Sequence, residues 1–485
     1  MVTYTRNANG QVSTVTANVA GSPVALASSI TYLPFGPLNA LTYGNSLTFS
    51  ATYDQDYNPT NRTVSGGIYN HTYDTDDNGN IIQIGSTDYA YDALNRLDEE
   101  DSGSAVTYTY DATSNRLTKV NGGTVTTTVP SNSNKISAVG SDSYTYDAAG
   151  NITGDGTNTY TWNNAGQLAE VLVSSTPVGT YTYDSQNRRT KKVAGANTTH
   201  YVYGLNGLLY GEYDNAGDLI REYIYLNDAP LAQIDAGAPE VLTYLHTDHL
   251  GTPRFGTNSG GTQVWAWAGD AFGVGAPSGS ATVNIRMPGQ YVDAESGLFY
   301  NWNRYYNPAI GRYISSDPIG IEGGLNTFLY ADASPVMYVD PEGLDPSASC
   351  VAFYRACGSL LGTVIGYGTG VTAATAATIS TAGAAAPAAP SIIAGSTGLG
   401  LMGGAMLGEG IGQQMCPAGD ASSPITPFLS ENHSVEICKE ACDEALTDAT
   451  KLCMMLKSRK LRESCHADNA ILYSQCLKGC EDNDK

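Results

Sequence analysis

The chain has 485 residues, more than a single domain usually contains, so two or three domains are expected. It holds 33 Tyr and 54 Gly but only 8 Phe, and this composition favours a large β structure over helical bundles, because rings with a polar tip suit strands that have one wet face. The net charge of −23 argues against a nucleic-acid-binding surface on the bulk of the molecule.

The N-terminal residues do not form a signal peptide, because MVTYTRNANGQ has no apolar core after a basic start. Export would therefore need a dedicated secretion machine or an N-terminal region outside this chain. Residues 3–12 (TYTRNANGQV) already have the character of a degenerate repeat. We therefore expect the chain to be the C-terminal portion of a longer protein.

Tyr-Asp pairs followed by a turn recur through residues 1–235, and they begin at Tyr73, Tyr91, Tyr110, Tyr146 and Tyr183. Each unit alternates polar and aromatic residues and then turns on pairs such as Asn-Gly or Asn-Arg, which predicts two short strands joined by a hairpin. One hairpin cannot bury its apolar face alone, whereas a stack can. The spacing predicts a β array with a period of about 18 to 20 residues. We interpret the Tyr and Asp residues as ladder and turn residues rather than catalytic ones.

Residues 236–344 contain five motifs in a defined order. They are YLHTDHLGTPR from Tyr244, PGQYVDAESGLFYN from Pro288, RYYNP from Arg304, GRYISSDPIG from Gly311 and PVMYVDPEGL from Pro335. The ordered set resembles the core segment of Rhs/YD-repeat proteins, which include polymorphic bacterial toxins, the C components of insecticidal toxin complexes and, more distantly, animal teneurins. The resemblance implies a mainly β fold, in which the YD-repeat hairpins spiral into a partial hollow shell.

Carboxylates are concentrated at four places in this core: Asp293, Asp317, Asp332 and Asp340. Proline follows the second and the last, and it holds the preceding Asp in an extended conformation that fixes the direction of its carboxylate. Two carboxylates brought together cannot both ionise, and a pair that shares one proton can activate water to cut a peptide. The alternative is that these residues only form turns, since Asp-Pro and Pro-x-Gly are common in turns.

The resemblance gives this chemistry a target. In Rhs toxins and toxin-complex C components, the core closes the shell and releases the downstream domain by aspartyl-type autoproteolysis just after the DPxGL motif. Carried over to this sequence, the scissile bond is Leu344–Asp345, and Asp317 is the expected catalytic carboxylate. The further assignments are Asp293 as the partner of Asp317, Asp340 as a residue that positions the substrate strand, and Arg312 as a residue that orients a carboxylate by a bidentate pair.

His246 and His249, with Asp248 between them, form the one pattern within residues 236–344 that suggests a metal site. The pattern lacks a third well-spaced ligand, and its family context is structural. We therefore predict no metal and no other cofactor.

Residues 345–430 form an apolar segment that is rich in Gly, Ala and Thr, with no charged residue from Ala356 to Gly408. Gly recurs at every fourth position from Gly358 to Gly370 and again from Gly400 to Gly412, which on a helix makes a stripe of small residues. Each run lies in a stretch about long enough to span a bilayer, roughly 20 residues, and two prolines separate the runs. The segment predicts a membrane-inserting helical hairpin. A flexible linker inside the shell is the alternative, because many Thr, Ser and Gly residues make insertion marginal.

Residues 431–485 contain six Cys in a nested arrangement within two stretches of helical periodicity. Two antiparallel helices stapled by three disulfides would satisfy this arrangement, although six Cys allow 15 connectivities. Zinc binding with His466 is the alternative, and disulfides would imply an oxidising destination. Cys350, Cys357 and Cys416 lie outside the scheme. The expected pairs are Cys438–Cys480, Cys442–Cys476 and Cys453–Cys465.

Three hypotheses for the function follow. The first is a secreted Rhs-type toxin or surface protein whose shell encapsulates its own C-terminal tail, cleaves it off and delivers it to membranes. Its partners would be the tail as cargo, membrane lipid, an immunity protein and secretion machinery, with no nucleic acid and no enzymatic activity beyond autoproteolysis. The second is a structural or adhesive cell-surface protein whose repeats bind glycan or neighbouring cells. The third is a displaced fragment without a present function.

Overall fold

Antiparallel β-strands follow one another along residues 1–344, the part of the chain that the computed structural model describes except for residues 35–36 and 56. Within this part, the strands pair with their sequence neighbours and form sheets of 15, 14 and 4 strands. The helices of the described residues are two short 3-10 turns, η1 (Gly320–Gly323) and η2 (Ala331–Ala333). The prediction of a mainly β fold is confirmed. The predicted helical tail, with its membrane hairpin and its Cys pairs, lies outside the described residues.

The first sheet keeps the strand order of the sequence, from β1 to β15. Every pair is antiparallel, so each connection is a hairpin, as the repeats predict. Its strands are β1 (Val2–Arg6), β2 (Val12–Val19), β3 (Ser22–Tyr32), β4 (Leu38–Tyr43), β5 (Thr48–Tyr53), β6 (Pro59–Val64), β7 (Tyr69–Thr75), β8 (Ile81–Ile84), β9 (Thr87–Tyr91), β10 (Leu97–Asp101), β11 (Ala105–Tyr110), β12 (Arg116–Val120), β13 (Thr124–Thr128), β14 (Ala138–Val139) and β15 (Asp142–Ser143).

The second sheet continues in the same manner from β16 to β29. Its last strands lie beyond residue 235, so the β array extends into the segment that carries the core motifs. The strands are β16 (Thr145–Tyr146), β17 (Ile152–Gly154), β18 (Asn158–Trp162), β19 (Leu168–Val173), β20 (Thr176–Tyr183), β21 (Arg189–Ala194), β22 (Asn197–Tyr203), β23 (Leu209–Tyr213), β24 (Leu219–Leu226), β25 (Ala229–Asp235), β26 (Val241–Thr247), β27 (Pro253–Thr257), β28 (Gln263–Ala266) and β29 (Ser278–Gly279).

The third sheet is small and belongs to the core motifs. It contains β30 (Tyr291–Val292), β31 (Phe299–Asn301), β32 (Arg304–Asn307) and β33 (Arg312–Tyr313). Arg304 on β32 pairs with Asn301 on β31, and Tyr306 on β32 pairs with Tyr313 on β33. This register places the side chains of three core motifs next to one another.

Asp side chains close the hairpin turns of the repeats. Asp92 Oδ1 accepts the backbone N–H groups of Leu94 and Arg96 at 2.9 and 3.1 Å, and the residue between them, Asn95, has a φ of 58°. The turn role predicted for these Asp residues is thus what the structure shows. In the repeat that begins at Tyr73, however, Asp76 holds the turn, while Asp74 pairs with Gln83 inside the ladder.

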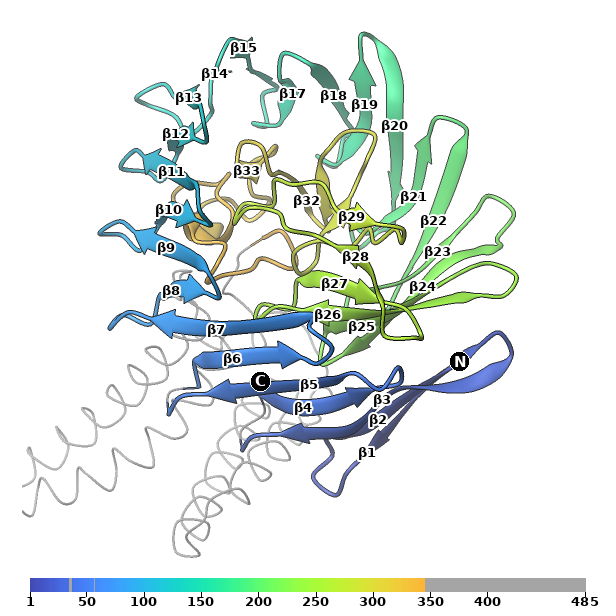
Figure 1. Cartoon of the computed structure of the whole chain (residues 1–485). Helices are drawn as coiled ribbons and strands as arrows, with labels where there is room; N and C mark the ends of the chain where they lie inside the picture. The colour runs from blue at the N-terminus through green and yellow to red at the C-terminus, as the bar shows by residue number, and fades with distance from the viewer. Residues whose placement is uncertain (35–36, 56, 345–485) are drawn as a thin grey trace, which may run out of the picture. The chain divides into compact units, whose positions relative to one another are not determined.

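The two large sheets meet along one side. Side chains of β2 to β5, such as Val15 and Tyr43, share a core with Ile234 on β25 and Tyr244 on β26. The amide of Asn45 also donates to Thr257 Oγ1 at 2.9 Å. The sheets run around the core segment, which is drawn in yellow and orange in Figure 1. Strands near the start of the chain, β2 to β5, therefore pack against β25 and β26, which lie much later in the sequence.

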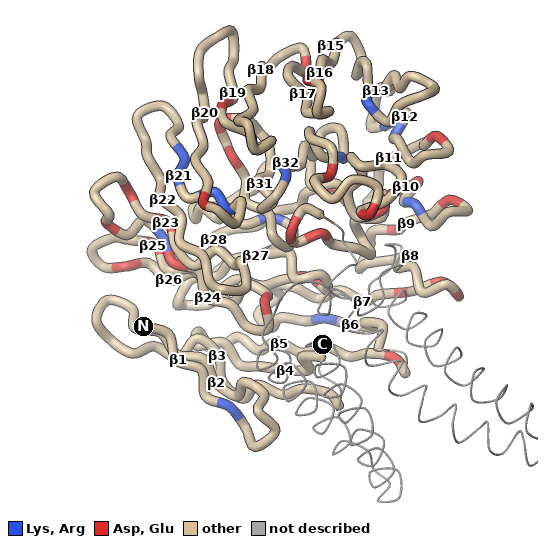
Figure 2. Tube along the Cα trace, turned by 180° about the vertical axis from the view of Figure 1, so that it is seen from behind, with Lys and Arg blue, Asp and Glu red and all other residues tan. Residues whose placement is uncertain are grey.

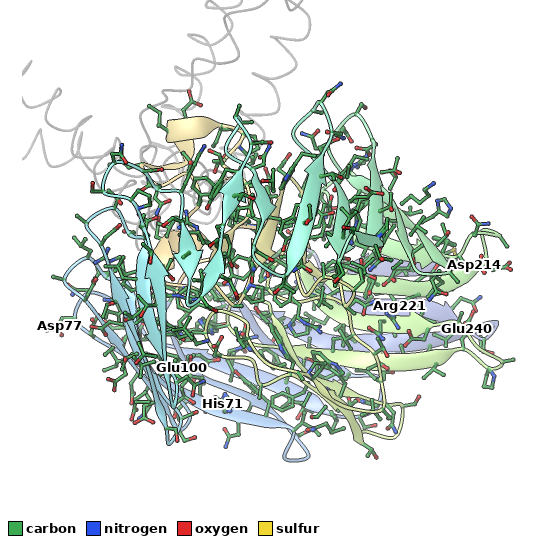
Figure 3. All side chains as sticks on the ribbon, turned by 90° about the horizontal axis from the view of Figure 1, so that it is seen from above. His71, Asp77, Glu100, Asp214, Arg221 and Glu240 are labelled. Atoms are coloured by element: carbon green, nitrogen blue, oxygen red, sulfur yellow. The ribbon has the colours of Figure 1, made fainter. Side chains whose placement is uncertain are left out.

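The core segment packs against both sheets. Phe272 and Val336 join Tyr73, Leu97 and Tyr108 of the first sheet. Residues of the third sheet, including Tyr300 and Tyr305, join side chains of the second sheet such as Tyr160, Tyr181 and Tyr201. Figure 3 shows how densely side chains occupy the space between the strands and the core, with Arg221 further inside than Asp77 and Asp214. The core thus couples the two halves of the array through buried rings.

Acidic residues lie at many of the hairpin ends, as the red segments of the tube in Figure 2 show. Within the described residues, the acidic side chains are thus spread over many hairpin ends rather than confined to one patch. None of the helices in the described part is long and apolar enough to cross a membrane.

Candidate active site

Arg304 is the centre of a buried charged cluster, and 2% of its side chain is exposed. One nitrogen, Nη2, lies 2.9 Å from Asp317 Oδ2 and 3.1 Å from Asp340 Oδ2. Both carboxylates therefore converge on a single guanidinium nitrogen. Asp317 follows β33, Asp340 lies in the segment PVMYVDPEGL, and the third sheet brings both to β32.

The same guanidinium holds the end of the DPxGL motif. Its Nη2 donates to the carbonyl oxygen of Leu344 at 2.9 Å, and its Nε donates to the carbonyl of Gly343. The backbone N–H of Leu344 donates in turn to Asp340 Oδ1 at 3.0 Å. The carbonyl of the expected scissile bond is thus held by the same nitrogen as the two carboxylates. Asp345, on the other side of that bond, lies outside the described residues.

Two further side chains brace the cluster. The hydroxyl of Tyr313 donates to Asp340 Oδ2 at 2.7 Å, and its ring lies under the Arg304 guanidinium at 3.6 Å from the ring centroid. Burial, together with the charge of Asp340, raises the pKa of Tyr313 well above its usual value of 10, so the hydroxyl stays a donor. The amide of Asn301 donates to Tyr313 and to the carbonyl of Asp340, both at 2.7 Å.

Gly323, in η1, closes the site from the third side. A β-carbon built on it would lie 2.6 Å from Asp317 Oδ2 and 3.0 Å from the carbonyl oxygen of Leu344. A side chain at position 323 would therefore clash with the carboxylate of Asp317 unless that carboxylate moved, and it would crowd the Leu344 carbonyl. Since Gly323 is outside the left-handed region, the constraint is one of space rather than of backbone conformation.

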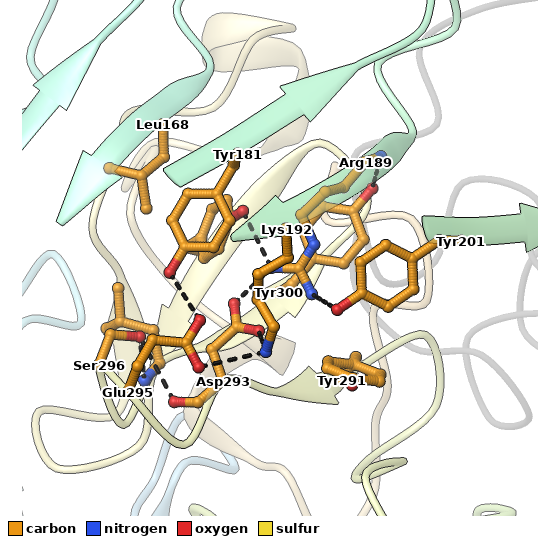
Figure 4. A network of polar contacts seen from close by, with 12 residues as sticks. Leu168, Tyr181, Arg189, Lys192, Tyr201, Tyr291, Asp293, Glu295, Ser296 and Tyr300 are labelled. Atoms are coloured by element: carbon orange, nitrogen blue, oxygen red, sulfur yellow. Dashed lines mark hydrogen bonds and ion pairs between the residues drawn. The ribbon is translucent and has the colours of Figure 1, made fainter. Parts of the chain in front are cut away.

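Asp293, the expected partner of Asp317, is part of another cluster. Its Oδ2 accepts from Arg189 and its Oδ1 accepts from Lys192 at 2.9 Å, with both Arg189 and Asp293 fully buried (Figure 4). Lys192 also contacts Glu295 at 3.1 Å. Burial by itself lowers the pKa of Arg189 and Lys192, but the nearby carboxylate of Asp293 opposes it, and both pKa values end above their usual values. The structure brings Asp340, rather than Asp293, to the carboxylate of Asp317.

Arg312 does not hold a carboxylate of the described residues in an ion pair. Its Nη1 donates to Asn115 Oδ1 at 3.1 Å and its Nη2 to the carbonyl of Asn134 at 2.6 Å, so it ties the core to the first sheet. The role expected for Arg312 is taken by Arg304. The motif RYYNP contains Arg304, but nothing local marks its side chain as the shared partner of residues 13 and 36 positions later.

His246, Asp248 and His249, the residues of the pattern that suggests a metal site, each bind a different partner. His246 Nε2 lies 2.8 Å from Thr257 Oγ1, His249 Nε2 lies 2.8 Å from the carbonyl oxygen of Val336, and Asp248 binds Arg254 at 2.9 Å. No group of three or more His, Cys, Asp or Glu side chains converges as a metal site within the described residues. Of these contacts, the one between His249 and Val336 joins the second sheet to the core.

His246 provides a prediction about acid stability. Burial lowers its pKa to about 3 from the usual 6.5, so the folded protein stays neutral at this site while the unfolded chain takes up a proton below about pH 6.5. Protonation of His246 in the unfolded chain therefore costs no folding stability well above pH 6.5, and it costs progressively more as the pH falls towards 3. Between pH 7 and pH 5 the wild type should therefore lose about 2 kcal/mol more stability than His246→Gln. Urea unfolding at the two pH values measures this difference, and equal losses in both proteins would contradict it.

Comparison with known proteins agrees with this architecture. The Teneurin YD-shell family model matches residues 82–326, just over half of the chain. The crystal structure of TcdB2-TccC3-Cdc42 has the same fold, with a TM-score of 0.61 and 21% identity over 71% of this chain and 20% of that one.

Two bacterial relatives carry toxin names. Double-stranded DNA deaminase toxin A of Burkholderia cenocepacia is 29% identical over 274 residues, which cover 42% of this chain and 19% of that protein. Toxin protein Tse5 of Pseudomonas aeruginosa is 44% identical over 104 residues, 21% of this chain and 8% of that protein. The chain spans less than a fifth of the length of either relative. By its repeats, its core and the matching family model, the chain belongs to the Teneurin YD-shell family of Rhs/YD-repeat proteins.

Proposed function

We propose that this chain is the shell portion of a toxin-type Rhs protein, and that its core cleaves the peptide bond after Leu344 to release the segment that follows. The observation that carries the proposal is the shared Arg304 nitrogen, which contacts Asp317, Asp340 and the Leu344 carbonyl at 2.9 to 3.1 Å. A carboxylate, a cation and a carbonyl held together in a buried site are the elements that peptide hydrolysis needs.

The reaction assigns a separate role to each charged group. Asp317 takes a proton from a water molecule that attacks the carbonyl carbon of Leu344. The oxygen of that carbonyl becomes an oxyanion, which the guanidinium of Arg304 stabilises because it already donates to the same atom. Asp317 then returns the proton to the nitrogen of Asp345 as the bond breaks. The products are a carboxylate at Leu344 and a free amine at Asp345.

Asp340 serves as a positioning residue in this scheme. Its Oδ1 accepts from the N–H of Leu344, and its Oδ2 accepts from Tyr313 and Arg304. These contacts restrain Leu344, and they support the positioning role that we propose for Asp340. A restrained carbonyl next to its nucleophile lowers the entropic cost of the reaction.

The released segment would be residues 345–485, acting as the cargo of the shell. The toxin names of the relatives support export or display at the cell surface, and they support an immunity protein as a partner. The membrane hairpin in residues 345–430 and the disulfide-stapled hairpin in residues 431–485 stay predictions.

Intact mass analysis of the purified chain tests the cleavage. The wild type should separate into two fragments with a cut between Leu344 and Asp345, whereas Asp317→Asn should stay whole because it has no carboxylate to activate water. A single uncut chain in both proteins would remove the protease from the proposal and favour a structural or adhesive role.

Gly323→Ala tests the same site without changing a charge. The added β-carbon would meet Asp317 Oδ2 and the Leu344 oxygen, so cleavage should be slowed or lost. Gly123→Ala is the matched control, because a β-carbon there meets nothing within 4 Å and its φ is also outside the left-handed region. Cleavage of Gly323→Ala at the rate of Gly123→Ala would contradict the arrangement.

A further inference from the structure

Two arginines line one small cavity at the seam between the first sheet and the core. Arg116 lies on β12 and Arg312 on β33, and both residues line the cavity. Its volume is about 10 Å³, which is about what one water molecule needs. Tyr110, Ser114, Phe272 and Gly311 are among the other lining residues. The seam therefore contains a space next to two positive charges.

Each arginine has a buried nitrogen without a hydrogen-bond partner. These nitrogens are Arg116 Nη1 and Arg312 Nε, and Arg312 is only 6% exposed. The remaining contacts of both residues are neutral: Arg116 donates to the carbonyl of Ala309 at 2.6 Å, and Arg312 donates to Asn115 and Asn134. Buried donors in folded proteins nearly always have a partner, so these two require one.

Neither guanidinium has a carboxylate within ion-pair distance among the described residues, although acidic residues outnumber basic ones in this chain. Burial, helped by the charge of Arg116, lowers the pKa of Arg312 to about 10, although Tyr146 and Asp111 act in the opposite direction. The carboxylate oxygens of Asp111 bind Thr113 and Asn115 instead. Two like charges thus lie at a low-dielectric seam without a counter-charge in contact.

Gly311 makes the space for this arrangement. A β-carbon on Gly311 would lie 2.6 Å from Arg116 Nη1 and 3.0 Å from the ring of Phe272. The ring of Phe272 also covers the Arg116 guanidinium, at 5.0 Å from the ring centroid. Arg116 Nη1 therefore packs beside Gly311 and close to the ring of Phe272, and it has no polar partner among the described residues.

We propose that this cavity binds a monatomic anion of about the size of chloride, which bridges Arg116 and Arg312 and joins the repeat sheet to the core. An anion satisfies both donors and offsets both charges, whereas a water molecule satisfies the donors only. A cavity volume of about 10 Å³ suits a monatomic ion better than sulfate, phosphate or a carboxylate ligand. The site is independent of the proposed cleavage, which uses a different arginine.

Bromide provides a direct test, because it replaces chloride and scatters anomalously. Crystals of the full chain soaked in sodium bromide should show an anomalous peak within hydrogen-bond distance of Arg116 Nη1 and Arg312 Nε. A map with no anomalous peak in the cavity, or with an ordered water there, overturns the proposal.

Thermal unfolding provides the second test, at constant ionic strength in sodium chloride and in sodium gluconate. Wild-type Tm should be about 2 to 4 °C higher in chloride, as expected for a ligand that binds only the folded state. Arg116→Met should lose this difference, while Arg6→Met should keep it, since Arg6 is exposed and its one hydrogen bond is to Gly10. Equal Tm values in both salts for the wild type, or a retained difference in Arg116→Met, overturn the proposal. If Arg116→Met does not fold, the bromide map of the wild type decides.

Discussion

Replacing Arg189 by methionine should lower the free energy of unfolding by about 3 to 5 kcal/mol, because it leaves the carboxylate of Asp293 buried with half of its counter-charge removed. Both side chains are 0% exposed, and Lys192 would remain as the other cation on Asp293. The substitution also removes a guanidinium that lies over several tyrosine rings, including Tyr300 at 4.4 Å from the ring centroid. Urea unfolding of the purified chain measures the loss.

Arg188 provides a matched control for this prediction. It is the preceding residue and it also binds a carboxylate, Asp184, at 2.9 Å, but the two side chains are 20% and 25% exposed. Arg188→Met should therefore cost at most about 1 kcal/mol. In a third variant, Arg189→Met with Asp293→Leu removes both charges and should recover part of the loss. Equal effects of the two single substitutions would contradict the assignment of the stabilisation to burial.

The expected size of this effect follows from the position of the cluster. Arg189 and Lys192 lie on β21 of the second sheet, whereas Asp293 and Glu295 lie between β30 and β31 of the core (Figure 4). The hydroxyl of Tyr300 also accepts the backbone N–H of Arg189 at 2.8 Å. These contacts join residues more than 100 positions apart, so their loss weakens the attachment of the core to the sheet.

Replacing Arg304 by methionine should have the second large effect, on both stability and cleavage. The substitution leaves Asp317 and Asp340 buried without their shared cation, which should cost about 3 to 5 kcal/mol. It also removes the donor to the Leu344 carbonyl, and loss of one such donor typically slows a reaction about 100- to 1,000-fold. Intact mass against time measures cleavage, and urea unfolding measures stability.

Arg304→Lys separates the two effects. Lysine keeps the positive charge, but its single ammonium group cannot reproduce the planar fork that reaches two carboxylates and three carbonyls. We expect this variant to be more stable than Arg304→Met and still to be slow in cleavage. If Arg304→Lys cleaves as fast as the wild type, the guanidinium geometry is unimportant and charge alone is sufficient.

Part of the candidate site could be predicted from the sequence, since Asp317, Asp340 and Leu344 are marked by their motifs and meet in the structure. Asp293, the expected partner of Asp317, instead binds Arg189 and Lys192 in the structure. Arg312 lies one residue before Tyr313 in the right motif, yet its side chain faces the first sheet. Motif membership therefore located the region but did not identify the contacts.

The β array itself is determined by the sequence, because its signals are local. Alternating residues form strands, and a turn of Asp, Asn and Gly residues needs only its own neighbours, as Asp92 does with Leu94 and Arg96. The pairing of charges is decided by the tertiary structure alone. Arg304 meets Asp340 across 36 residues, and Arg189 meets Asp293 across 104. No local preference encodes such a pair, since it forms only when the sheets enclose the core and bury both charges together.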